Sequence, residues 1–149
     1  MGSQSNKMGT YRKVKTIDNY RCEDYLHQVT NIRHRNIMTK LRLSNHRLAI
    51  ETGRYMRPYK KPNERICPLC RKEAEDEKHL SVVSCPVYQE KRKSLFECLY
   101  KEFKILIVKM STENIFLLLL NPLSNNVDLQ KIVAKHIHNC YEIRQKKPC

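Results

Sequence analysis

Apolar side chains recur every three or four residues along most of the chain, a period that predicts α-helices with one buried face. The first pattern starts near a cap at Asp18 or Asn19 and predicts one helix, whose buried face comprises Cys22, Tyr25, Leu26, Val29 and Ile32. A second helical pattern runs through Ile37, Met38 and Leu41 until Ser44 and Asn45 break it. Gly53 then predicts the end of a short helix that contains Leu48, Ala49 and Ile50.

Helical spacing resumes in the second half of the chain. A helix over residues 88–103 is expected to bury Leu95, Phe96, Leu99, Tyr100 and Phe103. Ser111 or Thr112 can cap a short apolar helix that extends to Leu120, and a turn at Pro122 follows it. A last amphipathic helix over residues 127–144 is expected to turn inward Leu129, Ile132, Val133, Ile137, Cys140 and Tyr141.

These patterns predict a mainly α fold. With 149 residues the chain suffices for one ordinary domain. We expect a disordered basic tail over residues 1–17, a single helical domain over 18–145 with an embedded zinc-binding module over 64–88, and a short tail over 146–149.

The segment between the two helical halves carries three cysteines and a histidine spaced C-x2-C, eight residues, then H-x5-C. Thiolate and neutral imidazole are the ligands that zinc prefers in a tetrahedral site, and the spacing predicts Cys67, Cys70, His79 and Cys85 as its ligands. Asp76 can cap a short helix through His79, which must end before Cys85 for both to reach one ion. Two other interpretations are a CPLC redox pair and a set of unrelated thiols with a histidine.

Four protein ligands leave no open position for substrate or water, so the zinc would be structural. A second Cys and His pair, His136 and Cys140, lies four residues apart on the last predicted helix. That pair is either half of another metal site or core packing. Cys22, Cys98 and Cys149 have no partner of suitable spacing.

The excess of basic side chains indicates a class of binding partner. The chain has 29 Lys and Arg against 15 Asp and Glu, and residues 1–66 account for 15 of the basic side chains but only 5 of the acidic ones. Such an excess attracts polyanions, so RNA or DNA is the expected partner. The side chains expected to contact it, with Tyr55 and Tyr59 interleaved for base stacking, are Arg33, Arg35, Lys40, Arg42, Arg47, Arg54, Arg57, Lys60, Lys61 and Arg65. The loop from Arg54 to Arg65 is the strongest candidate, since it leads into the zinc segment.

The longest apolar runs, 105–108 and 115–120, are far shorter than the roughly 20 residues that span a bilayer. No apolar run follows the basic start of the chain, as a secretory signal would require. We therefore expect no membrane partner and an intracellular location, nuclear or cytoplasmic.

The order of these motifs resembles a known family. TKLRLSNHRLAIETGR, a basic proline-containing loop, ICPLC, EDEKH and CPVY together resemble the region that follows the polymerase in reverse transcriptases of non-LTR retrotransposons. The resemblance spans residues 20–88 and extends more weakly to about residue 144. It implies a CCHC zinc knuckle that helps to hold RNA or target DNA, with ligands at Cys67, Cys70, His79 and Cys85. This chain has five residues between His79 and Cys85, one more than the family usually has.

The sequence lacks the acidic pair that a polymerase needs, because its four aspartates, Asp18, Asp24, Asp76 and Asp128, are scattered. After the knuckle only Glu90 precedes a basic run, which does not make a nuclease metal site. We therefore expect no catalytic residues and no small-molecule substrate. The leading hypothesis is a non-catalytic nucleic-acid-binding module, and the alternative is a zinc-stabilised module for protein–protein interaction.

Overall fold

The computed structural model describes residues 23–43, 45–76, 79, 85–105, 107–120 and 126–146. Helices dominate these residues and no strand occurs among them, which confirms the mainly α fold. The first part of the chain contains α2 (Asp24–Gln28), α3 (Ile32–Arg42), α4 (Ala49–Thr52) and a 3-10 turn, η1 (Pro62–Glu64). The second part contains η2 (Pro86–Tyr88), α6 (Gln89–Phe103), η3 (Ile107–Lys109), α7 (Thr112–Leu120) and α8 (Val127–Lys146).

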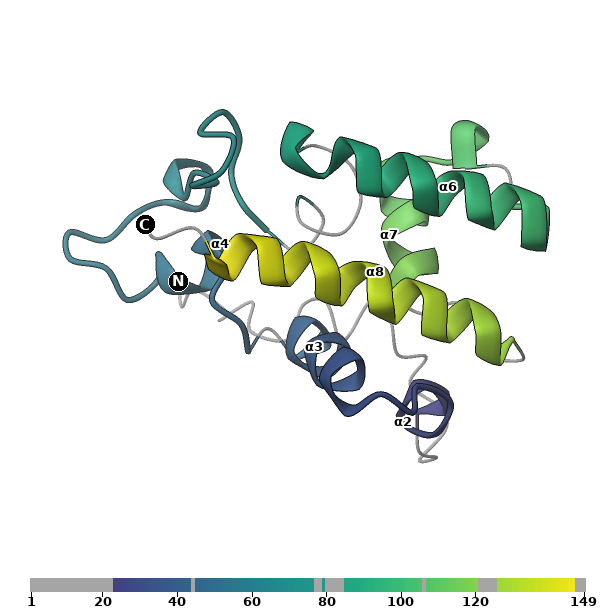
Figure 1. The fold of residues 1–149 in the computed structure, drawn as a ribbon. Coiled ribbons are helices and arrows are strands. Elements are labelled where there is room, and N and C mark those ends of the chain that lie inside the picture. The colour runs from purple at the N-terminus through teal and green to yellow at the C-terminus, as the bar shows by residue number, and fades with distance from the viewer. Residues whose placement is uncertain are drawn as a thin grey trace.

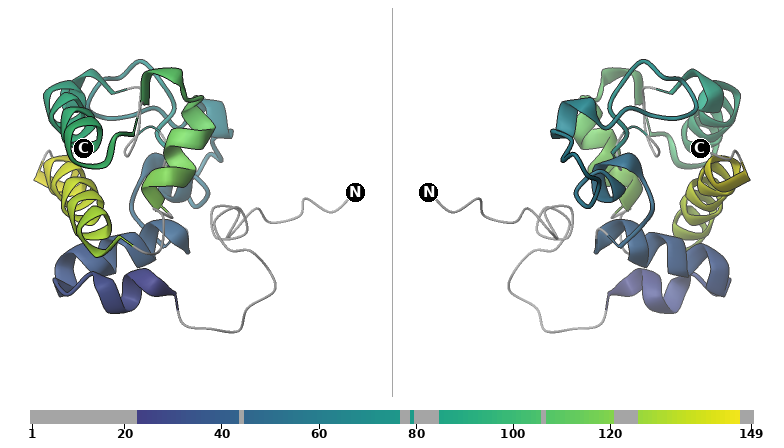
Figure 2. Two further views of the ribbon diagram at one scale, coloured as in Figure 1. Left: turned by 90° about the vertical axis from the view of Figure 1, so that its right-hand side faces the viewer. Right: turned by 90° about the vertical axis from the view of Figure 1, so that its left-hand side faces the viewer.

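Helix α8 is the centre of the fold. It crosses the molecule with α6 on one side and α3 and α2 on the other (Figure 1). Figure 2 shows α7 across the interior from α6 and α8. The side chain of Asn126 caps α8 by accepting from the backbone N–H of Leu129 at 3.0 Å. All six residues expected to face inward on this helix, Tyr141 included, are part of the core or pack against it.

The expected single helix from residue 22 to 32 is wrong. Helix α2 ends at Gln28, and the backbone becomes extended at Val29. The carboxamide oxygen of Asn31 then accepts hydrogen bonds from the backbone of Arg33 and His34, which starts α3 as a new helix. Ile32 is consequently exposed, while Tyr25 and Val29 stay buried. The expected cap at Asp18 or Asn19, like Cys22, lies outside the described residues.

Helices α3, α4 and α7 follow their patterns. Helix α3 buries Ile37, Met38 and Leu41, as expected. Gly53 ends α4. The hydroxyl of Ser111 accepts from the backbone N–H of Asn114 at 3.2 Å and so caps α7.

Helix α6 differs from expectation at one position. Leu95 and Leu99 are buried, and Phe96 and Phe103 pack against the core, but Tyr100 is 54% exposed. Its position is about 100° around the helix from Leu99, on the edge of the buried face.

Arg42 is the largest polar side chain enclosed by these helices. It is 2% exposed, donates to the Glu23 carboxylate at 2.9 Å and to the carbonyl of Leu120, and stacks over the Tyr25 ring at 4.1 Å. The guanidinium thus satisfies a carbonyl at the end of α7 and joins α2, α3 and α7. No helix in the described part of the chain is long and apolar enough to cross a membrane.

Candidate metal centre

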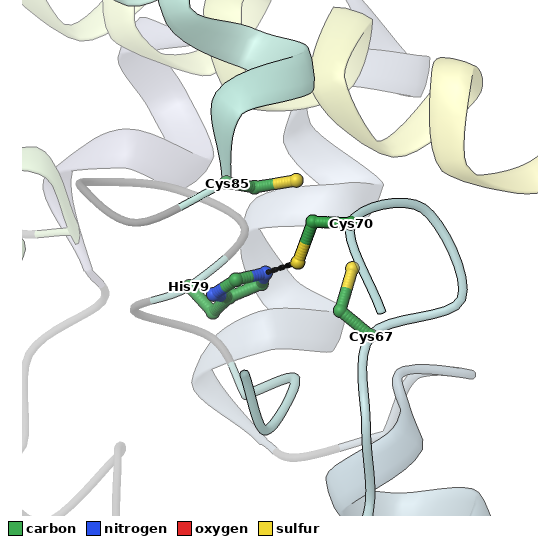
Figure 3. A group of neighbouring side chains, drawn as sticks. All are labelled: Cys67, Cys70, His79 and Cys85. Atoms are coloured by element: carbon green, nitrogen blue, oxygen red, sulfur yellow. Dashed lines mark hydrogen bonds between the residues drawn. The ribbon is translucent and has the colours of Figure 1, made fainter. Parts of the chain in front are cut away.

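The four residues predicted as ligands meet at one point. One donor atom from each of Cys67, Cys70, His79 and Cys85 lies within 4.8 Å of all the others. Figure 3 shows the thiols of Cys67 and Cys70 on one side, with the His79 ring and Cys85 reaching them from separate segments. Cys67, His79 and Cys85 are buried and Cys70 is partly so. This is the one such group among the residues that the structure describes.

The loop around the first two cysteines is fixed by its own backbone. Ile66 and Ala74 form an antiparallel bridge, and the backbone N–H of Cys67 donates to the carbonyl of Glu73 at 2.8 Å. The chain reverses direction through a turn in which Arg71 donates its N–H to the carbonyl of Cys67. Arg71 has φ of 55°, a left-handed conformation that side chains other than glycine, asparagine and aspartate adopt rarely. The turn brings the two sulfurs to the same side.

Local hydrogen bonds hold the backbone at the other two donors. The Asp76 carboxylate accepts from the backbone N–H of His79 at 2.8 Å, the contact that a capping residue makes, while the helix expected to follow lies outside the described residues. Cys85 immediately precedes η2, where the N–H of Tyr88 donates to its carbonyl at 3.1 Å, and Arg92 of α6 donates to the same carbonyl at 3.1 Å. The expected stop of the helix between His79 and Cys85 falls outside the described residues.

Burial raises the pKa of the Cys67 thiol to about 12 and raises that of Cys85 as well. Backbone N–H groups oppose this effect: those of Leu69 and Cys70 stabilise the Cys67 thiolate. At Cys70 burial also raises the pKa, but hydrogen bonds from the N–H groups of Lys72 and Glu73 and from the Cys67 and Cys85 thiols together outweigh it, so the thiol pKa is lower than usual. The polypeptide therefore offers hydrogen bonds to thiolates in a site where, without a cation, two thiols keep their protons.

His79 presents one ring nitrogen to the sulfurs and the other to a carboxylate. Its Nε2 lies 3.5 Å from the Cys70 Sγ, and its Nδ1 lies 3.8 Å from a carboxylate oxygen of Glu73. Nδ1 is buried without a hydrogen-bond partner among the described residues. Burial lowers the pKa of His79, which favours the neutral imidazole that metals bind. A carboxylate near the second nitrogen is the usual companion of a metal-binding histidine.

These separations fit a tetrahedral metal site. Bonds of about 2.3 Å to sulfur and 2.0 Å to nitrogen give edges of about 3.6 Å between sulfur and nitrogen and about 3.8 Å between sulfurs. The observed 3.5 Å between Cys70 and His79 matches the first value. No separation exceeds 4.8 Å, which is at most about 1 Å longer than a tetrahedral edge. The group can hold a metal ion, with all four positions taken by protein atoms.

The sequence patterns did not identify several residues that surround the cluster. Glu75 is 1% exposed, and both of its carboxylate oxygens accept from the Arg144 Nε, at 3.0 and 2.8 Å. One of these oxygens also accepts from the backbone N–H of Ala49 at 2.8 Å. This pair connects the end of α8, the start of α4 and the loop of residues 66–76 that carries Cys67 and Cys70, which we call the metal loop. Nothing in the acidic run EAEDE distinguishes the buried Glu75 from Glu73, which is exposed, because the partner of Glu75 lies 69 residues away.

Tyr88 is a further neighbour of the cluster. Its buried hydroxyl has no hydrogen-bond partner among the described residues. Burial raises its pKa, and the charges of Cys85, Cys140 and Cys67 raise it further.

The basic residues predicted to bind nucleic acid divide into two groups. Arg33, Lys40, Arg47, Arg57, Lys60 and Lys61 are exposed. The others are engaged within the protein: Arg54 pairs with Glu51 at 3.3 Å, and Arg35 donates to the carbonyls of Leu26 and Val29. Arg42 and Arg65, 2% and 4% exposed, must be removed from the predicted set, because burial separates their guanidinium groups from any phosphate.

His136 and Cys140 are both buried, with the Cys140 Sγ 3.7 Å from the His136 Nε2. They belong to the core face of α8, and no third ligand joins them within the described residues. Core packing therefore accounts for this pair.

No protein-family model matches the chain, and no significant match was found among curated proteins or solved structures.

Proposed function

We propose that the protein is a non-catalytic, zinc-stabilised module that binds RNA or DNA through the basic residues beside its metal loop. Three thiols and an imidazole favour zinc among the common cellular metals. Zinc in such a site contributes on the order of 10 kcal/mol of apparent binding free energy, enough to order a loop that buries little apolar surface. The closed ligand set leaves no position for substrate, which favours a structural role.

The observation that carries the proposal is the placement of the loop cations. Arg57, Lys60 and Lys61 are exposed, and no ion pair within the described part of the chain uses their side chains. The segment 54–65 contains five basic residues and one acidic residue, Glu64, and it ends at the first ligand pair. Cations held without acidic partners next to a rigid turn are available to phosphates.

The resemblance to the tail of retrotransposon reverse transcriptases supports the same function. In that interpretation the module derives from the region after a polymerase and keeps its nucleic-acid contact without an active site. The order of the basic loop and the four ligands is the feature that the resemblance rests on.

The experiment measures binding of a fluorescent single-stranded oligonucleotide by anisotropy over a range of salt concentrations. Each lost phosphate contact should reduce the slope of log affinity against log salt by about 0.7, so replacing Arg57, Lys60 and Lys61 by Ala should reduce it by about 2. The matched control replaces Lys93, Lys101 and Lys131, three exposed lysines of α6 and α8. An unchanged slope in the loop variant, or an equal reduction in the control, would refute the proposal.

A protein–protein interaction module is the alternative, and the exposure of three large apolar side chains, those of Tyr55, Met56 and Ile66, favours it. Exposed large apolar side chains are a common feature of docking surfaces. This function predicts that replacing Arg57, Lys60 and Lys61 leaves the affinity for the oligonucleotide and its salt slope unchanged, so the same variants separate the two functions.

A further inference from the structure

The loop that carries the free cations also exposes large rings. Tyr55 is 74% exposed and Tyr59 is 63% exposed, and Arg57, Lys60 and Lys61 are interleaved with them. The 3-10 turn η1 and the metal loop follow directly. Exposed aromatic rings alternating with cations match the chemistry of a single-stranded nucleic acid, which offers base faces and phosphates in alternation.

Tyr59 differs from Tyr55 because a buried guanidinium holds it. The Arg65 Nη2 donates to the Tyr59 hydroxyl at 3.2 Å, and the guanidinium carbon lies 5.5 Å from the ring centroid. Arg65 is itself fixed, because it donates to the carbonyl of Ile50 at 2.6 Å and to that of Lys60 at 3.0 Å. A ring that is already oriented loses little conformational entropy when a base stacks on it.

The position of Arg65 depends on two neighbours. Gly53 leaves room for it: a Cβ at that position would lie 2.5 Å from the Arg65 Cγ and 2.6 Å from its Cδ. The backbone of Arg65 is held by the metal loop, where Glu75 donates its N–H to the Arg65 carbonyl at 2.9 Å. The contacts therefore run from the metal loop through Arg65 to the ring of Tyr59.

We propose that Tyr59 is a stacking platform for an unpaired base, that Arg65 is its positioning residue, and that the loop therefore selects single-stranded over duplex nucleic acid. The inference rests on the proposed function and names its substrate class. In a duplex the base faces are covered by their neighbours in the stack, so the ring of Tyr59 has nothing to contact. The cations of the loop bind phosphates in either form, and the ring supplies the difference between them.

The test compares an unstructured single strand with a blunt duplex in anisotropy titrations at one salt concentration. Tyr59→Ser should weaken single-strand binding about tenfold and leave duplex binding unchanged. Tyr59→Trp should retain single-strand affinity because it keeps a stacking surface. The matched control is Tyr100→Ser on α6, since Tyr100 is also an exposed tyrosine with a lysine, Lys104, over its ring at 6.0 Å.

The role of Arg65 has its own variant. Tyr59→Phe keeps the ring but removes the acceptor that Arg65 uses, so its single-strand affinity should fall between those of wild type and Tyr59→Ser. Equality of Tyr59→Phe with wild type would overturn the positioning role.

Three results overturn the inference, and they are distinguishable from one another. If Tyr59→Ser has no effect on the single strand while replacing Lys60 and Lys61 weakens both forms, the stacking platform is wrong and the proposed function stands. If wild type binds neither oligonucleotide, the proposed function fails with it. Equal weakening of single strand and duplex by Tyr59→Ser also overturns the selectivity.

Discussion

Replacing Arg144 by Met should destabilise the protein severely, because it leaves the carboxylate of Glu75 buried without its cation. Glu75 is 1% exposed and takes two contacts of 2.8 and 3.0 Å from the Arg144 Nε. After the change it keeps one backbone donor, the N–H of Ala49 at 2.8 Å. Removing one partner of a buried ion pair costs about 3–5 kcal/mol, which is about a fifth to all of the stability of a typical domain, about 5–15 kcal/mol.

The assay is unfolding by guanidinium chloride at neutral pH and a fixed zinc concentration, followed by circular dichroism. Zinc must be held constant because a bound ligand shifts apparent stability. Lys146→Met removes an exposed cation from the same end of α8 and should change stability by no more than about 0.5 kcal/mol. It is the matched control for the loss of charge.

A double variant separates loss of the pair from loss of packing. Glu75→Gln keeps an oxygen for Ala49 but removes the uncompensated charge, so adding it to Arg144→Met should restore about 1–3 kcal/mol. A cost below about 1 kcal/mol for Arg144→Met would show that water reaches the carboxylate. A double variant no more stable than Arg144→Met would show that charge is not the cause. Either result would refute the reasoning.

Three further predictions concern the metal loop and its neighbours. Purified protein should contain one zinc per chain by elemental analysis. The variant Cys67→Ser should lose this zinc, while the control Cys98→Ser, a change on α6, should keep it. Full zinc content in Cys67→Ser would contradict the site. Because burial raises the pKa of Cys67 and Cys85, zinc must displace protons from both, so its apparent affinity should fall as pH is lowered from 8 to 6 in chelator competition, and a pH-independent affinity would count against thiolate ligation. Gly53→Ala should cost about 1–3 kcal/mol in the same denaturant assay, since its Cβ would collide with Arg65, whereas the exposed Thr52→Ala should cost less, and equal costs would argue that Arg65 simply moves aside.

The sequence was most informative where the physics is local. Helical spacing predicted α3, α6, α7 and α8 because the period of apolar residues depends only on the helix itself. The candidate ligand set was predictable for the same reason, since the CPLC turn and the hydrogen bond from His79 to Asp76 are built within a few residues. The break before α3 was also readable in principle: Asn31 is a strong capping residue in front of a helical run, and it outweighed the apolar pattern that continues through Ile32.

The tertiary structure alone decided which charged side chains are buried and which are exposed. By sequence, Arg65 is one more cation in a basic loop, like Lys60 and Lys61; in the structure it is buried behind Tyr59, while the two lysines remain in water. Arg42 and Glu75 were hidden in the same way, because their partners lie far along the chain. Whether a charged side chain stays hydrated depends on which distant segments of the chain cover it, and no local sequence pattern predicts that. The sequence therefore determined most of the helices and the four residues that can hold a metal, whereas the fold determined which cations hold the protein together and which remain exposed to solvent.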